Sequence, residues 1–226
     1  MRRRNKFITS ESKTINIAGI CANYLQESQR VYGGLFNFVI EKCFSWRFQD
    51  TMIMIETGRL VLRQWREEDV APFAEMNRDV EVMEHMPKCL SREESEQFYR
   101  RIMAEHEACG YGLYALELKD TGTFIGYTGF HHFDFDADFA PGIEIGWRIA
   151  RRYWNQGYAT EAARACISYA RAKSLFNEIY SFTAVCNHRS ERVMQKIGME
   201  RHGWFLHPAL PDGHRLKPHV VYRLDL

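Results

Sequence analysis

The hydrophobic period of the chain changes between residues 142 and 173, and this change marks the centre of the predicted fold. In residues 142–150 (GIEIGWRIA), isoleucine and tryptophan alternate with polar residues and glycine, which is the period of a strand. After a short turn, small apolar residues recur three and four positions apart from Ala162 to Ala170, which is the period of an amphipathic helix. The segment therefore predicts a strand, a tight turn, and a helix that lies flat on a sheet.

The turn between these two elements, residues 155–160 (NQGYAT), is a candidate anion site. The first N–H groups of a helix lack intrahelical partners and lie at the positive end of its dipole. Gly157 allows a ligand to approach the main chain closely, and Ala159 keeps the next contact small. Such a turn favours a phosphate, although one glycine before a helix is also common where only packing requires it.

Similar patterns predict the remaining elements. We expect strands at residues 59–64, 111–118, 123–130, 177–185, 201–206 and 216–224, and helices at residues 66–77, 91–108 and 187–197. Ser91 and Glu94 form a capping box at the start of one helix, and Gly198 ends another. Residues 131–141 are expected to form a loop, in which three aspartates alternate with phenylalanines.

Composition places the chain among ordinary globular proteins. Of its 226 residues, 46% are hydrophobic and 26% are charged, and the net charge is +1, so nothing demands a nucleic-acid partner. No apolar run approaches the ~18 residues of a membrane span. The six cysteines form no C-x-x-C pair, which favours a reducing compartment and a cytoplasmic location.

Residues 1–51 do not join the pattern. They hold eight Lys/Arg and four Asp/Glu, whereas the remainder of the chain is net acidic. Two interpretations compete: an added helical or interaction segment, or translated upstream sequence with Met52 or Met54 as the natural start. We favour the second. The predicted domains are therefore an N-terminal extension (1–51) and a catalytic domain (52–226).

Two motifs resemble those of a known family. The first comprises Glu144, Gly146, Trp147, Tyr153, Trp154, Gly157, Tyr158, Ala159, Thr160, Glu161 and Ala162, and the second comprises Asn187, Ser190, Val193, Lys196, Gly198 and Met199. Together they resemble the acyl-CoA-binding signatures of the GNAT N-acetyltransferases, above all the branch that contains RimJ and RimL. The resemblance implies an α+β (three-layer α/β) fold with a mixed sheet of about seven strands, the fourth and fifth being parallel and splayed apart.

The resemblance also implies where acetyl-CoA binds. The expected contacts are Trp147, Arg148, Ile149, Asn155, Gln156, Gly157, Tyr158, Ala159, Thr160, Asn187 and Ser190. Backbone N–H groups of the turn would hold the pyrophosphate, and the backbone of residues 147–149 would bind the pantetheine arm. Asn187 has a second interpretation as a helix N-cap.

Catalytic roles are expected for Glu144, Ser190 and His219. Glu144 is the candidate general base, with a surface glutamate paired to Arg148 as the alternative. His219 is a candidate second base, with a strand-edge histidine as the alternative. Met194 stands where many GNAT enzymes have a tyrosine acid, so Ser190, Tyr153 or water would have to protonate the leaving thiolate.

The implied function is acetyl-CoA-dependent N-acetylation of a primary amine, either a protein N-terminus or a small amine. The alternatives are a non-catalytic acyl-CoA sensor, which Met194 favours, and a nucleotide-binding protein, for which a Walker lysine is missing. Histidine spacings match no metal site, so no metal is expected. Asp134, Asp136 and Asp138 would bind a metal, solvate a loop or, as we favour, attract a cationic amine. A homodimer is left open.

Overall fold

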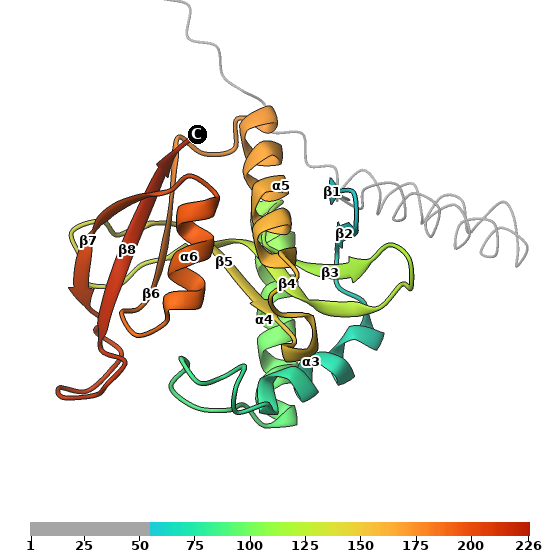
Figure 1. Ribbon diagram of the computed structural model, residues 1–226, viewed down its shortest axis with the longest axis horizontal. Helices are drawn as coiled ribbons and strands as arrows, with labels where there is room; N and C mark the ends of the chain where they lie inside the picture. Colours follow the sequence, from blue (N-terminus) through green and yellow to red (C-terminus); the bar gives the residue numbers. More distant parts are fainter. Residues whose placement is uncertain (1–54) are drawn as a thin grey trace, which may run out of the picture. The chain divides into compact units, whose positions relative to one another are not determined.

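The structure is a computed structural model that describes residues 55–226, so the expectations for residues 1–51 and for a start at Met52 or Met54 lie outside the described residues. The described chain forms one sheet in the order β1-β2-β3-β4-β5-β6-β8-β7 (Figure 1). Its elements are β1 (Ile55–Glu56), β2 (Leu60–Arg63), η1 (Glu67–Asp69), α3 (Val70–Arg78), α4 (Arg92–Cys109), β3 (Leu113–Leu118), β4 (Phe124–Phe133), β5 (Gly142–Ile149), η2 (Arg151–Tyr153), α5 (Tyr158–Lys173), β6 (Glu178–Ala184), α6 (His188–Lys196), β7 (Glu200–Leu206) and β8 (Pro218–Asp225).

The sheet opens between β5 and β6. Every other neighbouring pair is antiparallel, whereas β5 and β6 are parallel and share a single register pair, Glu144 with Tyr180. Beyond that pair the two strands run apart (Figure 1). This confirms the predicted mixed sheet with a splay at its centre. The sheet has eight strands because the two-residue β1 pairs with β2.

Helices cover both faces of the sheet. On one face, α5 buries Ala162, Ala163, Cys166 and Ala170 against the inward residues of the strands. These side chains are small, so the helix approaches the sheet closely, as its sequence predicts. On the other face, α3 and α4 pack around Phe73 and Ile102. Within the part of the chain that the structure describes, no helix is both long and apolar enough to cross a membrane.

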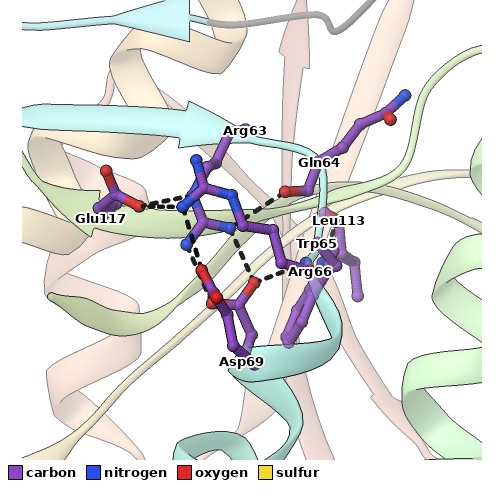
Figure 2. Close-up of polar contacts among 8 residues, drawn as sticks. Arg63, Gln64, Trp65, Arg66, Asp69, Leu113 and Glu117 are labelled. Atoms are coloured by element: carbon purple, nitrogen blue, oxygen red, sulfur yellow. Dashed lines mark hydrogen bonds and ion pairs between the residues drawn. The ribbon is translucent and has the colours of Figure 1, made fainter. Parts of the chain in front are cut away.

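A buried ion network anchors the start of this second layer (Figure 2). The guanidinium of Arg63 donates from Nη1 and Nη2 to the two carboxylate oxygens of Asp69, at 2.7 and 2.9 Å, and from Nε to Glu117 at 2.7 Å. Asp69 also accepts the backbone N–H of Arg66 at 2.8 Å, and Trp65 donates to the carbonyl of Leu113 at 2.7 Å. These bonds tie β2, η1 and β3 together. Because both members of the central pair are buried, each needs the other to offset its lost hydration.

Most boundaries agree with the sequence prediction to within one or two residues, and two differ by more. The helix expected from residue 66 begins as the 3-10 turn η1 before α3. More consequentially, β4 continues to Phe133, so the loop expected from residue 131 begins three residues later. The extension is held by pairing, because His131 lies opposite Glu144, and Phe133 lies opposite Gly142. This places His131 beside the candidate base.

Candidate functional site

A cavity of about 630 Å³ follows the opening between β5 and β6. One end lies at the first turn of α5 and the N-terminal half of α6, and the other lies over the face of β5 that is covered by α3, α4 and the loop between them. The cavity lining includes all predicted site residues except Gln156: Glu144, Trp147, Arg148, Ile149, Asn155, Gly157, Tyr158, Ala159, Thr160, Asn187, Ser190 and His219. The structure therefore brings the predicted cofactor and catalytic residues to one continuous space.

The main chain of β5 presents alternate residues to the opening. The carbonyl of Arg148 lies 2.1 Å from where a Cβ on Gly126 of β4 would stand, and the carbonyl of Gly146 accepts a hydrogen bond from Thr128 of β4 at 2.9 Å. Both residues thus direct their main-chain groups to β4. Since main-chain direction alternates along a strand, Trp147 and Ile149 direct theirs into the opening toward β6. Of the expected 147–149 contacts, the geometry favours these two and not the backbone of Arg148.

The turn before α5 is wound in the left-handed region. Asn155 has φ 60° and Gly157 has φ 82°, and no side chain caps the helix. The first intrahelical bond runs from the N–H of Glu161 to the carbonyl of Gly157 at 3.0 Å. The N–H groups that precede Glu161 in the helix therefore have no acceptor within the helix. Such N–H groups at a positive dipole end form a ready anion site. Gln156 does not line the cavity.

Arg59, which the sequence analysis did not single out, braces this turn from the edge of β2. Its Nη1 donates to the carbonyl of Gln156 at 3.0 Å, its Nε donates to Glu161 at 2.7 Å, and its guanidinium lies 4.5 Å from the ring centre of Tyr158. Only its position at the start of a strand was visible in the sequence. The contacts span about a hundred residues, so no local pattern could reveal them.

The facing wall of the opening is the start of α6. Asn187 accepts the N–H of Ser190 at 3.2 Å and donates to Thr183 at 2.9 Å, so it acts as the N-cap that was one of its two interpretations. Ser190 and Val193 share its cavity-facing side. Met194 is fully buried in the core and does not line the cavity.

Trp154 closes one corner of this opening. Its indole N–H donates to the carbonyl of Ile149 at 2.7 Å, and the guanidinium of Arg189 lies 4.6 Å from its ring centre. The ring therefore connects the end of β5 to α6. Arg192 and Lys196 also line the cavity on α6, so this end is positively charged.

At the other end, Glu144 stands in a row of three ionisable side chains. His131 is directly opposite it on β4, and Nδ1 of His131 lies 2.8 Å from Glu105 of α4. Burial raises the pKa of Glu144 to about 7, with the charge of His131 opposing the rise. The hydrogen bond to Glu105 raises the pKa of His131, against the partial desolvation of its ring. A carboxylate with this pKa can both take and release a proton near neutral pH.

The pairing of Glu144 with Arg148, considered from the sequence, does not occur among the described residues. The guanidinium of Arg148 donates instead to Asn77 of α3 at 2.7 Å. Glu105 is held in the anionic form. Burial raises its pKa, but hydrogen bonds from His131 and from the backbone of His132 outweigh this effect, so the pKa is lowered.

His219 lies away from Glu144. It pairs with Ala184, four residues along β6 from the Tyr180 that pairs with Glu144, which corresponds to about 13 Å along the strands. Its ring packs 4.9 Å from that of His207, and burial lowers the pKa of both histidines. His219 thus lines the cavity as a neutral ring, at a position along the strands different from that of Glu144.

The loop aspartates do not line the cavity. Asp134, Asp136 and Asp138 are exposed, while Phe135 and Phe139 pack inward on β6 and β7. Their proposed attraction of an amine could act only at a distance. No group of three or more potential metal ligands meets in residues 55–226.

Comparisons with known proteins bear on the family and the fold of the chain. The acetyltransferase (GNAT) domain family matches residues 59–200. The uncharacterized N-acetyltransferase YnaD of Bacillus subtilis (strain 168) is 29% identical over 75% of this chain and 95% of its own length. An acetyltransferase (GNAT family) structure from Bacillus anthracis is 28% identical, with a TM-score of 0.65 over 76% of this chain and 98% of that one. The coenzyme A complex of RimL, a ribosomal L7/L12 α-N-protein acetyltransferase, is 15% identical, with a TM-score of 0.64 over 77% and 98% of the two chains, and so shares the fold.

Proposed function

Because this chain belongs to the GNAT acetyltransferase family, as the match over residues 59–200 shows, we propose that it transfers the acetyl group of acetyl-CoA to a primary amine by direct attack. The carrying observation is the continuity of the cavity, which joins the uncapped start of α5 to the Glu144 carboxylate. Acetyl-CoA supplies the activated acetyl thioester.

The cofactor end of the cavity suits a long anionic ligand. The backbone of Gly157, Tyr158, Ala159 and Thr160 would hold the pyrophosphate, since these groups lie at an uncapped helix start with left-handed backbone at the glycine. A Cβ at Gly157 would point toward Arg59, 3.6 Å away. The pantetheine arm would bond to the main chain of Trp147 in the opening.

Glu144 would act as the general base. An α-amine has a pKa near 8, so losing its proton at pH 7 costs only about 1.4 kcal/mol, and a carboxylate with a pKa of about 7 is well matched to accept it, directly or through a water. The neutral amine nitrogen then bonds to the carbonyl carbon and the carbonyl oxygen takes up the negative charge. Collapse of this oxyanion breaks the carbon–sulfur bond, and the remaining excess proton of the nitrogen passes to the departing sulfur or to water. An N–H of Trp147 or Ile149 would stabilise the oxyanion, a contribution of about 3 kcal/mol for one donor.

The leaving group needs little help from an acid. A thiol has a pKa of about 8.5, so a thiolate can depart near neutral pH without being protonated in the same step. Ser190 and Tyr153, which both line the cavity, are candidate donors. The burial of Met194 in the core therefore does not argue against turnover, and the non-catalytic sensor becomes the weaker alternative.

The decisive assay measures thiol release from acetyl-CoA over a panel of protein N-terminal peptides and small amines, alongside calorimetric binding of CoA. We expect CoA to bind and at least one amine to release thiol. Binding without release for every amine would favour the sensor, and no binding of any CoA species would refute the site itself.

A further inference from the structure

The floor of the acceptor end of the cavity carries one carboxylate and one guanidinium, separated by a glycine. Glu144, Gly146 and Arg148 alternate on the same face of β5, and all three line the cavity. A Cβ at Gly146 would meet only the Glu144 carboxylate within 4 Å, at 3.9 Å. The space above this glycine is therefore open. The Cα atoms of the two charged residues lie about 13 Å apart, as expected for four residues of strand.

Arg148 is held in place by neutral groups. Its Nη1 donates to Asn77 Oδ1 at 2.7 Å, and its Nη2 lies 3.2 Å from the sulfur of Met86. Its guanidinium carbon lies 5.4 Å from the ring centre of Tyr127 and 6.0 Å from that of Phe98. These contacts fix the orientation of the guanidinium without neutralising its charge, and they leave part of its five N–H donors uncommitted.

No carboxylate pairs with Arg148 in residues 55–226. Only two carboxylates line the cavity there, Glu81 and Glu144. Glu81 is bound by Arg151 at 2.7 Å, and Glu144 faces His131. The amide of Asn77 is itself fixed, because its nitrogen donates to buried Ser95 at 3.1 Å, so its oxygen is turned toward the arginine. A half-buried cation held this firmly without a counter-ion requires an explanation.

We propose that Arg148 binds an anionic group of the acceptor, so that the acceptor is a primary amine that also carries a carboxylate or a phosphate. This inference rests on the proposed acetyl transfer, because it places the amine at Glu144. The planar fork of an arginine suits either anion in a two-pronged contact. An extended chain spans at most about 3.6 Å per residue, so a separation of about 13 Å corresponds to an acceptor of roughly three to four residues or of similar length.

The experiment compares matched acceptors. Di-, tri- and tetraglycine are tested against their C-terminal amides, and ω-aminoalkyl phosphates against the corresponding amino alcohols, by thiol release from acetyl-CoA. The proteins are the wild type, Arg148→Met, Arg148→Lys and the control Arg100→Met, which removes an exposed arginine of α4 outside the cavity lining. Calorimetry of each acceptor with the CoA-loaded protein measures binding separately from turnover.

We expect the wild type to prefer the anionic member of a pair by about 10- to 100-fold in kcat/KM, the usual range for a charge-assisted contact. In Arg148→Met that ratio should fall toward one, in Arg148→Lys it should be partly kept, and in Arg100→Met it should be unchanged. The series with the larger ratio identifies the anion as carboxylate or phosphate.

Equal use of charged and neutral acceptors by the wild type, or a preference that survives in Arg148→Met, would overturn the inference. If no amine is acetylated but the anionic peptides still bind more tightly than their amides, the inference stands and the proposed activity fails. If the neutral amines are acetylated as well as the anionic ones, the activity stands and the inference fails.

Discussion

Replacing Glu144 with glutamine should stabilise the protein above neutral pH while removing its activity. The side chain sits in a setting that raises its pKa from 4.5 to about 7. Between these two values the native state holds a proton that the unfolded chain has already released, so stability falls as pH rises through this window. Above pH 7 the buried charge lowers the free energy of unfolding by its full amount. Glutamine is uncharged at every pH, so the variant does not have this loss.

The magnitude follows from the size of the pKa shift. At about 1.4 kcal/mol per unit, the rise corresponds to about 3 kcal/mol as an upper value. Glu144 is half-buried, and the water that reaches it screens part of this cost. We therefore expect Glu144→Gln to raise the free energy of unfolding at pH 8 by about 1 to 3 kcal/mol, and to change it by less than about 0.5 kcal/mol at pH 4.5.

The assay is urea unfolding of both proteins at the two pH values, with exposed Glu107→Gln on α4 as the matched control. Subtracting the wild-type value from the variant value at each pH removes the titration of groups that the substitution does not affect, and the change of this difference between the two pH values isolates Glu144. In the same variant, thiol release should fall at every pH while CoA affinity stays near that of the wild type. An equal stability change at both pH values, or a loss of stability at pH 8, would show that Glu144 does not bear a buried charge.

Three further predictions test the groups around the site. His131→Asn removes the positive charge opposite Glu144, and at roughly 6 Å and an effective dielectric of 20 to 80 it should move the acid limb of kcat/KM upward by roughly 0.5 to 2 pH units; a limb at the wild-type pH would contradict this. Gly157→Glu should weaken CoA binding in calorimetry far more than Gly122→Glu, which changes a glycine with φ 65° outside the cavity lining, and similar affinities would place the pyrophosphate elsewhere. Asp69→Ala should cost about 3 to 5 kcal/mol in urea unfolding because it removes both carboxylate contacts of the Arg63 Nη atoms and leaves this buried guanidinium with Glu117 alone; a loss below about 1 kcal/mol would refute that role.

The central fold was predictable because one local stretch encodes it. The alternation in residues 142–150 and the helical period after the turn correspond to β5 and α5, and both follow from which side chains must leave water. The ends of the helices and strands were harder to predict. The end of β4 was misplaced because His131 and His132 are polar and exposed, so hydrophobic periodicity gives no reason to continue the strand. Pairing with β5 provides that reason, and it is a tertiary contact.

That boundary also concealed part of the candidate site. Had the strand been extended to residue 133, the period of two would have placed His131 on the same face as Tyr127, but the register with Glu144 would still have been unknown. Glu105 was harder to predict from the sequence, because its position in the middle of a charged helix is typical of an exposed face. Only the packing of α4 on β4 brings it to His131.

The two ends of the cavity therefore differ in whether their residues are close together in the sequence. The proposed cofactor end consists largely of main-chain groups of β5, the turn and the first residues of α5, so a ligand bound there constrains neighbouring residues and leaves a compact motif. The acceptor end is made by side chains from separate elements. Arg148 depends on Asn77 and Met86, more than sixty positions away in the sequence, and each of these residues looks ordinary where it stands. A change in any one of them would alter which anion the arginine can reach while the motif stayed intact, and for this reason acceptor choice must be read from the folded chain.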